Sequence, residues 1–247
     1  MFNKENFKDT NASHIFLIMK LERLTKAALG DNICKNYFNC LARRTDGIDL
    51  ITRLGATQWA LGKSVVCLGY FDGVHLGHQA LLRQGKAIAK QNELLLCVHT
   101  YDIPPIKLLR PDLDYQELCT FEEKCKLLEA AGADIVAVSR FDQALMHMRG
   151  ADFFDRVVVE GMQAQHIVVG YDHRFGFMGD TGVDELRALC STEGIGLSVV
   201  EAVRTPDGRV ISSSAVRAAI RSQDWAQAEM MLGRPYPEAD QAMLPGR

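Results

Sequence analysis

The sequence predicts an α/β fold: a doubly wound, mostly parallel sheet of about five strands with helices on both faces. Short apolar runs recur along the chain, and amphipathic stretches of helical length separate them. The apolar runs are continuous rather than alternating, which is typical of parallel strands that are buried on both faces.

We expect five strands, at 64–68, 94–100, 135–139, 166–170 and 197–200. The helices expected between and after them are 79–91, 121–131, 151–160 and 184–193. Thr120 and Glu123 form a capping-box pattern at the start of the second helix. Because strands and helices alternate, we expect the active-site residues at the carboxyl ends of the strands.

The alternation of strands and helices begins near Ile48, and we place a domain boundary there. Residues 1–47 are rich in Asn and Lys and are interpreted as an N-terminal extension whose composition is compatible with disorder. Residues 48–236 are expected to form the α/β domain, and residues 237–247 a short tail.

The bulk composition points to a cytoplasmic protein without a nucleic-acid or membrane partner. A net charge of -3 gives no general attraction to nucleic acid or to an anionic membrane surface. No apolar stretch approaches the about 20 residues that span a bilayer. The seven cysteines are scattered and form no CxxC pair, as in reduced proteins of the cytoplasm, and a metal cluster is not expected.

The most informative stretch is 69–78, Gly-Tyr-Phe-Asp-Gly-Val-His-Leu-Gly-His, between a predicted strand and a predicted helix. Backbone N–H groups at a helix N-terminus attract anions. His75 and His78 are three residues apart and can share one helix face, while Gly77 leaves the backbone open to a ligand. Two histidines that only cap or pack are the simpler interpretation, but the glycines and Asp72 beside them favour a phosphate site.

A second candidate phosphate site begins at three serines, 212–214, which precede an apolar, helix-forming stretch. On its own this pattern indicates no more than a capped helix. Arg217 lies four residues after Ser213, so its guanidinium can reach the anion that the helix start attracts.

A polar loop follows the predicted strand at 166–170 and carries Asp172 and Arg174. A turn after a strand explains this polarity without a ligand. Its place at a strand's carboxyl end and its mixed charges favour a ligand role.

Residues 75–78 resemble the HxGH signature of the nucleotidyltransferase superfamily, and 69–78 resembles the longer motif of the adenylyltransferase module of prokaryotic-type FAD synthetase. Further segments resemble that family in the same order: 100–105, 120–128, 168–176, 211–217 and 232–236. The resemblance covers about 48–236, identifies this range as a nucleotidyltransferase domain and implies its Rossmann-like fold.

The resemblance implies FMN adenylyltransferase activity, with ATP and FMN as substrates, pyrophosphate as the second product, and Mg²⁺ bridging phosphate oxygens. It assigns catalytic roles to His75, His78 and Arg217. It assigns ATP binding to Gly69, Phe71, Asp72, Gly77, Asp172, Arg174, Ser213 and Ser214, and substrate binding to Thr100 and Asp102. The β- and γ-phosphates are expected at the 212–217 element. Riboflavin kinase activity is not expected, and neither a metal ligand nor the oligomeric state is assigned.

Three substitutions depart from the family pattern, and residues 177–180 also lack the basic residue commonly found there. Pro104 stands where the family usually has His, Tyr70 replaces a small polar residue, and His173 replaces Phe. Pro104 cannot donate a hydrogen bond or titrate. Two alternatives therefore stay open: a nucleotidyltransferase with a different phosphate-bearing acceptor, and a degenerate paralogue that only binds nucleotide or flavin.

Overall fold

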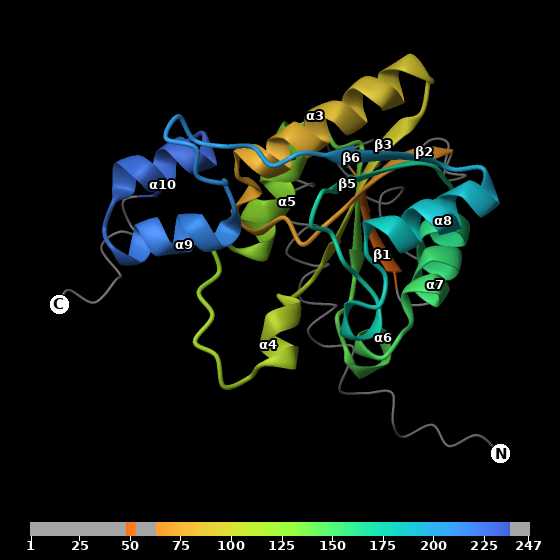
Figure 1. Ribbon diagram of the computed structural model, residues 1–247, viewed down its shortest axis with the longest axis horizontal. Helices are drawn as coiled ribbons and strands as arrows, with labels where there is room; N and C mark the ends of the chain where they lie inside the picture. Colours follow the sequence, from red (N-terminus) through yellow and green to blue (C-terminus); the bar gives the residue numbers. More distant parts are fainter. Residues whose placement is uncertain (1–47, 53–62, 238–247) are drawn as a thin grey trace, which may run out of the picture. The chain divides into compact units, whose positions relative to one another are not determined.

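Six strands form one sheet, in the order β1-β4-β3-β2-β5-β6 (Figure 1). The computed structural model describes residues 63–237, and of residues 48–52 it describes the backbone. The strands are β1 Ile48–Thr52, β2 Ser64–Leu68, β3 Leu95–Tyr101, β4 Ile135–Ser139, β5 Ala164–Gly170 and β6 Gly196–Val200. The predicted extension at 1–47 and all but the first residue of the predicted tail lie outside the described residues.

The five predicted strands and the doubly wound fold are confirmed. β2 to β6 run parallel, with bounds close to those expected, although β5 begins at Ala164 rather than at residue 166. β1 was not predicted. It pairs with β4 in the antiparallel direction at the edge of the sheet.

The helices cover the sheet and extend beyond it. They are α3 Leu76–Gln91, α4 Pro105–Leu109, α5 Phe121–Ala130, α6 Gln143–Met146, α7 Gly150–Phe153, α8 Val183–Glu193, α9 Ser213–Arg221 and α10 Trp225–Leu232. The helix expected at 151–160 is α7 followed by a π-helical stretch, Phe154–Gly161, where Met162 N–H bonds to the Val157 carbonyl five residues back. None of the helices in the described part of the chain is long and apolar enough to cross a membrane.

One face of the sheet packs against α3 and α5. Its core joins alternate strand residues, such as Val65 and Cys67 of β2, to Leu82 of α3 and Leu128 of α5. Residues of opposite parity point to the other face, where His99 of β3 meets the ring of Phe153 in α7 with ring centres 5.2 Å apart. Helices thus cover both faces.

α9 and α10 form a separate apolar cluster beside the start of α3. Its buried members include Ile220, Met231, Leu232 and Leu118. Through Leu118, this cluster is tied to the segment that leads into α5, and it holds the start of α9 close to the motif turn (Figure 1).

Gly85 marks the closest approach of α3 to the sheet. A Cβ atom added there would lie 2.6 Å from Cys67 Sγ and 2.9 Å from Leu96 Cδ1, both in the core. At an open helix position, Gly→Ala stabilises by about 0.5–1 kcal/mol. We expect Gly85→Ala to destabilise instead, by about 1–3 kcal/mol, because the core cannot accept the methyl group. Urea unfolding measures this, and Gln84→Ala at the adjacent exposed position is the control. A gain in stability for Gly85→Ala would contradict the packing.

Acid should destabilise the protein through its buried histidines. His99 is 1% exposed, its Nε2 lies 2.8 Å from Ser139 Oγ, and burial, followed by the charges of His173 and Lys124, lowers its pKa to about 3. Below pH ~6.5 the unfolded chain gains a proton at this residue that the folded chain does not. His99 therefore lowers the free energy of unfolding by about 1.4 kcal/mol for each pH unit between pH ~6.5 and pH ~3. We expect His99→Gln to flatten the slope of unfolding free energy against pH by that amount between pH 6 and 4.5; an unchanged slope would show that His99 protonates freely in the folded state.

Candidate active site

The strand order places a crevice between β2 and β5. From β2 the chain builds outward through β3 and β4 on one side, and then returns to add β5 and β6 on the other. Ligands of doubly wound proteins bind at such a switch point, at the carboxyl ends of the strands. The 69–78 motif follows directly on β2, so the chain delivers its two histidines to this crevice.

The turn between β2 and α3 is tight and strained. Phe71 and Val74 have φ values of 58° and 40°, and both side chains are buried. Each residue in this left-handed region costs about 1–3 kcal/mol, and such strain gathers at functional sites. The fold therefore holds this turn against its backbone preference, and the turn ends at His75.

His75 and His78 stack on each other. Their ring centres are 3.7 Å apart and the planes differ by 19°. His75 is the N-cap of α3, and its Nδ1 accepts from the backbone N–H of His78 at 3.4 Å. When neutral, His75 therefore carries its proton on Nε2. A Cβ on Gly77 would lie 3.0 Å from His75 Cε1, so the glycine makes room for the stacked ring.

Both histidines are neutral in the absence of a ligand. Burial, and then the positive charges of Arg217 and Arg234, lower the pKa of His75 to about 4. The pKa of His78 is also well below its usual value, first through burial and then through His75 and Lys124. His78 Nδ1 is buried and has no hydrogen-bond partner among the described residues. Because a buried, unpaired polar atom is costly, this nitrogen points to a ligand.

A cleft of about 220 Å³ opens beside the histidine pair. It is lined by the first turns of α3, by residues 170–172 after β5, by residues 200–203 after β6 and by residues 210–213 at the start of α9. Of the predicted site residues, it brings together His75, Gly77, His78, Asp172 and Ser213. Ligand pockets commonly enclose ~300–1,000 Å³, so a nucleotide bound here would extend beyond the cleft.

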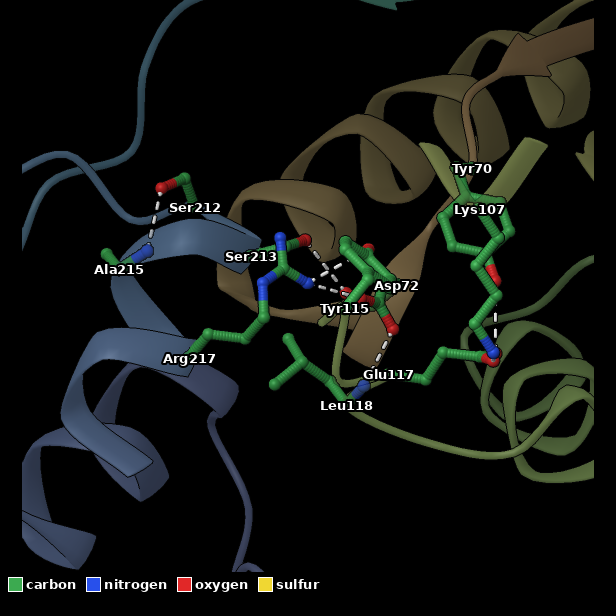
Figure 2. Close-up of polar contacts among 10 residues, drawn as sticks. All are labelled: Tyr70, Asp72, Lys107, Tyr115, Glu117, Leu118, Ser212, Ser213, Ala215 and Arg217. Atoms are coloured by element: carbon green, nitrogen blue, oxygen red, sulfur yellow. Dashed lines mark hydrogen bonds and ion pairs between the residues drawn. The ribbon is translucent and has the colours of Figure 1, made fainter. Parts of the chain in front are cut away.

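The start of α9 is tied to the motif turn. Ser212 caps the helix by accepting from Ala215 N–H at 3.2 Å, and Ser213 Oγ donates to the Asp72 carbonyl oxygen at 3.0 Å (Figure 2). Ser214 is exposed and lies outside the cleft lining. The two candidate phosphate sites of the sequence therefore meet at one place.

Arg217 lies against the motif turn rather than in the cleft lining. Its Nη1 donates to Asp72 Oδ2 at 2.6 Å and to the Tyr115 hydroxyl at 3.0 Å (Figure 2). The Tyr115 hydroxyl also donates to Asp72 Oδ2 at 2.8 Å, and the Leu118 N–H donates to Oδ1 at 3.0 Å. Asp72 and Arg217 thus form a buried ion pair, which the sequence did not predict.

The other predicted site residues have partners within the protein and do not line the cleft. Arg174 donates from Nε and Nη2 to the Gly179 carbonyl, and Thr100 Oγ1 donates to the Tyr70 carbonyl at 2.8 Å. Asp102 Oδ1 accepts from two backbone N–H groups, of Ile103 and Phe141. Gly69 lies against the ring of Phe71, at 3.0 Å from a built Cβ. Their roles in binding stay predictions.

The structure also shows where the three residues that depart from the family pattern lie. Pro104 is buried at the N-cap of α4, and the ring of His173 packs against Phe175. Tyr70 covers the ammonium group of Lys124, whose Nζ lies 3.8 Å from the ring centre. Sequence reasoning missed Lys124 and Tyr115. Lys124 carried a usable signal, since it falls on the apolar face of α5 with Phe121, Cys125 and Leu128.

Comparison with known proteins agrees with this geometry. The family model for FAD synthetase matches residues 57–215. A bifunctional riboflavin kinase/FMN adenylyltransferase of Bacillus subtilis is 35% identical over 179 residues, which cover 70% of this chain and 54% of that protein. An FAD synthetase of Listeria monocytogenes is 33% identical over 174 residues, 70% of each chain. The chain thus spans about half the length of the bifunctional relatives.

A solved structure supports the fold. The crystal structure of a protein named as a macrolide-efflux protein from Streptococcus pneumoniae superposes with a TM-score of 0.63 and 27% identity, over 71% of this chain and 57% of that one. The family match covers β2 to the start of α9, including the histidine motif and every element that lines the cleft. Motif, cleft and sequence similarity agree, and this chain belongs to the FAD synthetase family.

Proposed function

We propose that this protein is an FMN adenylyltransferase, which transfers AMP from ATP to FMN and gives FAD and pyrophosphate. The observation that carries the proposal is the meeting of the His75–His78 pair with the start of α9 in one cleft at the switch point. The names of the family's members supply the acceptor: they include FMN adenylyltransferase and FAD synthetase.

In the proposed reaction an oxygen of the FMN phosphate attacks the α-phosphorus of ATP. The new P–O bond forms as the bond from the α-phosphorus to the bridging oxygen breaks, and pyrophosphate leaves with that electron pair. The attacking phosphate is already anionic, so no strong base is required. Such chemistry depends on positioning and on neutralising charge.

The two histidines act as neutral donors in this proposal. His75 Nε2–H is free to donate to a phosphate oxygen, because its Nδ1 already accepts from His78 N–H. His78 offers the buried nitrogen that lacks a partner. The N-terminus of α3 adds backbone N–H groups and the positive end of the helix dipole.

Ser213 and Arg217 hold the leaving pyrophosphate, and Arg217 need not leave Asp72 to do so. A guanidinium has five N–H donors, and the contacts with Asp72 and Tyr115 both use Nη1. The remaining donors stay available to phosphate oxygens while the ion pair persists.

Mg²⁺ is part of the proposal, bound mainly by ATP. The described residues contain no cluster of three or more His, Cys, Asp or Glu side chains that could hold a metal ion. Mg²⁺ is commonly held by one or two carboxylates together with substrate phosphates, and Asp172 and Glu201 supply carboxylates in the cleft lining. Mg²⁺ would neutralise phosphate charge as it develops.

A second candidate is transfer of AMP to a different phosphate-bearing acceptor. The observations that favour it are the two departures from the family pattern: Pro104, which is buried and cannot donate a hydrogen bond, and Tyr70, whose ring covers Lys124.

One experiment separates these candidates. We expect the purified protein, incubated with ATP, Mg²⁺ and FMN, to release pyrophosphate and form FAD in equal amounts. The same assay is run with a panel of other phosphorylated acceptors. Pyrophosphate release with another acceptor only would favour the second candidate. Binding of nucleotide or flavin without any release would indicate a degenerate paralogue and overturn the proposal.

His78→Ala tests the mechanism. Removing one donor that stabilises charge in the transition state costs about 10²–10³-fold in rate, so FAD formation should fall at least that far. The fold should persist, because His78 is only half-buried and its Nδ1 has no partner among the described residues. The matched control is His166→Ala, since His166 lies near the amino end of β5 and bonds to Ser198. Turnover within a few-fold of the wild type in His78→Ala would exclude this role.

A further inference from the structure

A lysine is buried on the side of β2 opposite the cleft. Lys124 is 2% exposed and occupies a core-facing position of α5. Its Nζ donates to the Tyr101 carbonyl at 3.0 Å, lies 3.8 Å from the ring centre of Tyr70 and 5.4 Å from that of Phe121. Tyr101 is the last residue of β3, so the ammonium group lies at the carboxyl edge of the sheet.

This ammonium group has no ion-pair partner among the described residues. Burial lowers the pKa of Lys124 to about 8, so the charged form still prevails at neutral pH. Buried charges in proteins are normally paired, because an unpaired one is costly. Arg217, the other buried cation nearby, has Asp72 as its partner. Asp72 and Glu117 act on Lys124 from further away and raise its pKa, but among the described residues no carboxylate lies within ion-pair distance of it, as Asp72 does of Arg217.

The position of Lys124 suits the acceptor rather than ATP. The cleft lies on the β5 and β6 side of the histidine pair, whereas Lys124 is held by β3, on the other side of β2. The charge of Lys124 also contributes, after burial and His75, to the lowered pKa of His78. In an in-line displacement the attacking and leaving oxygens lie on opposite sides of the phosphorus. A cation opposite the ATP cleft is placed to hold the attacking phosphate.

Tyr70 covers this cation, and the outer support of its side chain is partly exposed to solvent. Its hydroxyl donates to Glu117 at 3.3 Å, and Glu117 forms an ion pair with Lys107 of α4 (Figure 2). The Lys107 and Glu117 side chains are 47% and 28% exposed. Exposed ion pairs contribute about 0–1 kcal/mol, so the outer support of Tyr70 is weak, and its main hold is the contact of its ring with the Lys124 ammonium group.

We propose that Lys124 binds the phosphate group of the acceptor, and that the acceptor displaces Tyr70 to reach it. This inference rests on the proposed function and adds the residue that recognises the acceptor. It assigns to Lys124 the discrimination between a flavin with a phosphate group and one without.

FMN and riboflavin test this assignment directly, since they share the ring system and differ in the phosphate. Flavin fluorescence gives the binding of each to the full chain, with Mg²⁺ and a non-hydrolysable ATP analogue present. We expect the wild type to bind FMN more tightly than riboflavin. Lys124→Met should weaken FMN binding about 10- to 100-fold, the range for a hydrogen bond to a charged group, and leave riboflavin binding within about 2-fold. Lys126→Met, on the exposed face of the same helix, is the control and should bind both flavins as the wild type does.

Stability separates this role from a structural one. If Lys124 serves binding, then removing its unpaired charge should leave the urea midpoint equal to or above that of the wild type. If Lys124 serves the fold through Tyr101 and Tyr70, Lys124→Met should lower the midpoint and keep the preference for FMN, and that result would overturn the inference.

Two further outcomes separate the inference from the proposed function. A wild type that forms FAD but binds FMN and riboflavin equally well would overturn the inference alone. A wild type that prefers FMN through Lys124 but forms no FAD would overturn the proposed function and leave the phosphate site standing. A wild type that binds neither flavin would overturn both.

Discussion

The site depends on the buried carboxylate of Asp72. The carboxylate accepts hydrogen bonds from Arg217, Tyr115 and Leu118, which lie 145, 43 and 46 residues further along the chain. The backbone carbonyl of Asp72 accepts a further hydrogen bond from Ser213. One residue thus joins the motif turn, the segment before α5 and the start of α9. Removing one partner of a buried ion pair costs about 3–5 kcal/mol, against a total stability of about 5–15 kcal/mol. These contacts offset the strain of the left-handed residues on either side of Asp72 and fix the direction from which the histidines enter the cleft.

The ion pair also sets the charge of the site. Asp72 offsets the charge of Arg217, while burial keeps His75 and His78 neutral. The cleft therefore presents directed hydrogen-bond donors, rather than a cluster of free cations, to the phosphate chain of the proposed substrate. Donors fixed before the ligand arrives need little reorganisation as charge develops, which is the source of most electrostatic catalysis. In the proposed reaction, Mg²⁺ would supply the counter-charge for the phosphates, and the donors of Arg217 that Asp72 and Tyr115 leave unused would add hydrogen bonds.

Local patterns predicted the sheet well, because its parallel strands are continuous apolar runs. They also predicted the start of α5, because its capping box lies within four residues. β1 could not be found this way, since a short edge strand is fixed by its partner β4 rather than by its own sequence. The histidine pair, Gly77 and Ser213 line one cleft for the same local reason, since strand ends and helix starts position them, and their binding roles stay predictions. The direction of Arg217 was not predictable, because it depends on a carboxylate 145 residues away. Thr100 and Asp102 make their hydrogen bonds with the backbone of the protein itself, and a ligand role for them stays a prediction.

The two halves of the site differ in what holds them. The half proposed for ATP consists of strand ends and helix starts, which are held by backbone hydrogen bonds and by the buried Asp72 contacts. The half proposed for the acceptor is closed by the Tyr70 side chain over Lys124, and its outer support is an exposed ion pair. Opening it costs the contact of Tyr70 with Lys124, and in this proposal the anion that Lys124 gains offsets that cost. Such an arrangement favours an acceptor that brings a phosphate over one that brings only an apolar ring. In this proposal, the departure of Tyr70 from the family pattern acts on how the acceptor enters and leaves the half proposed for ATP unchanged.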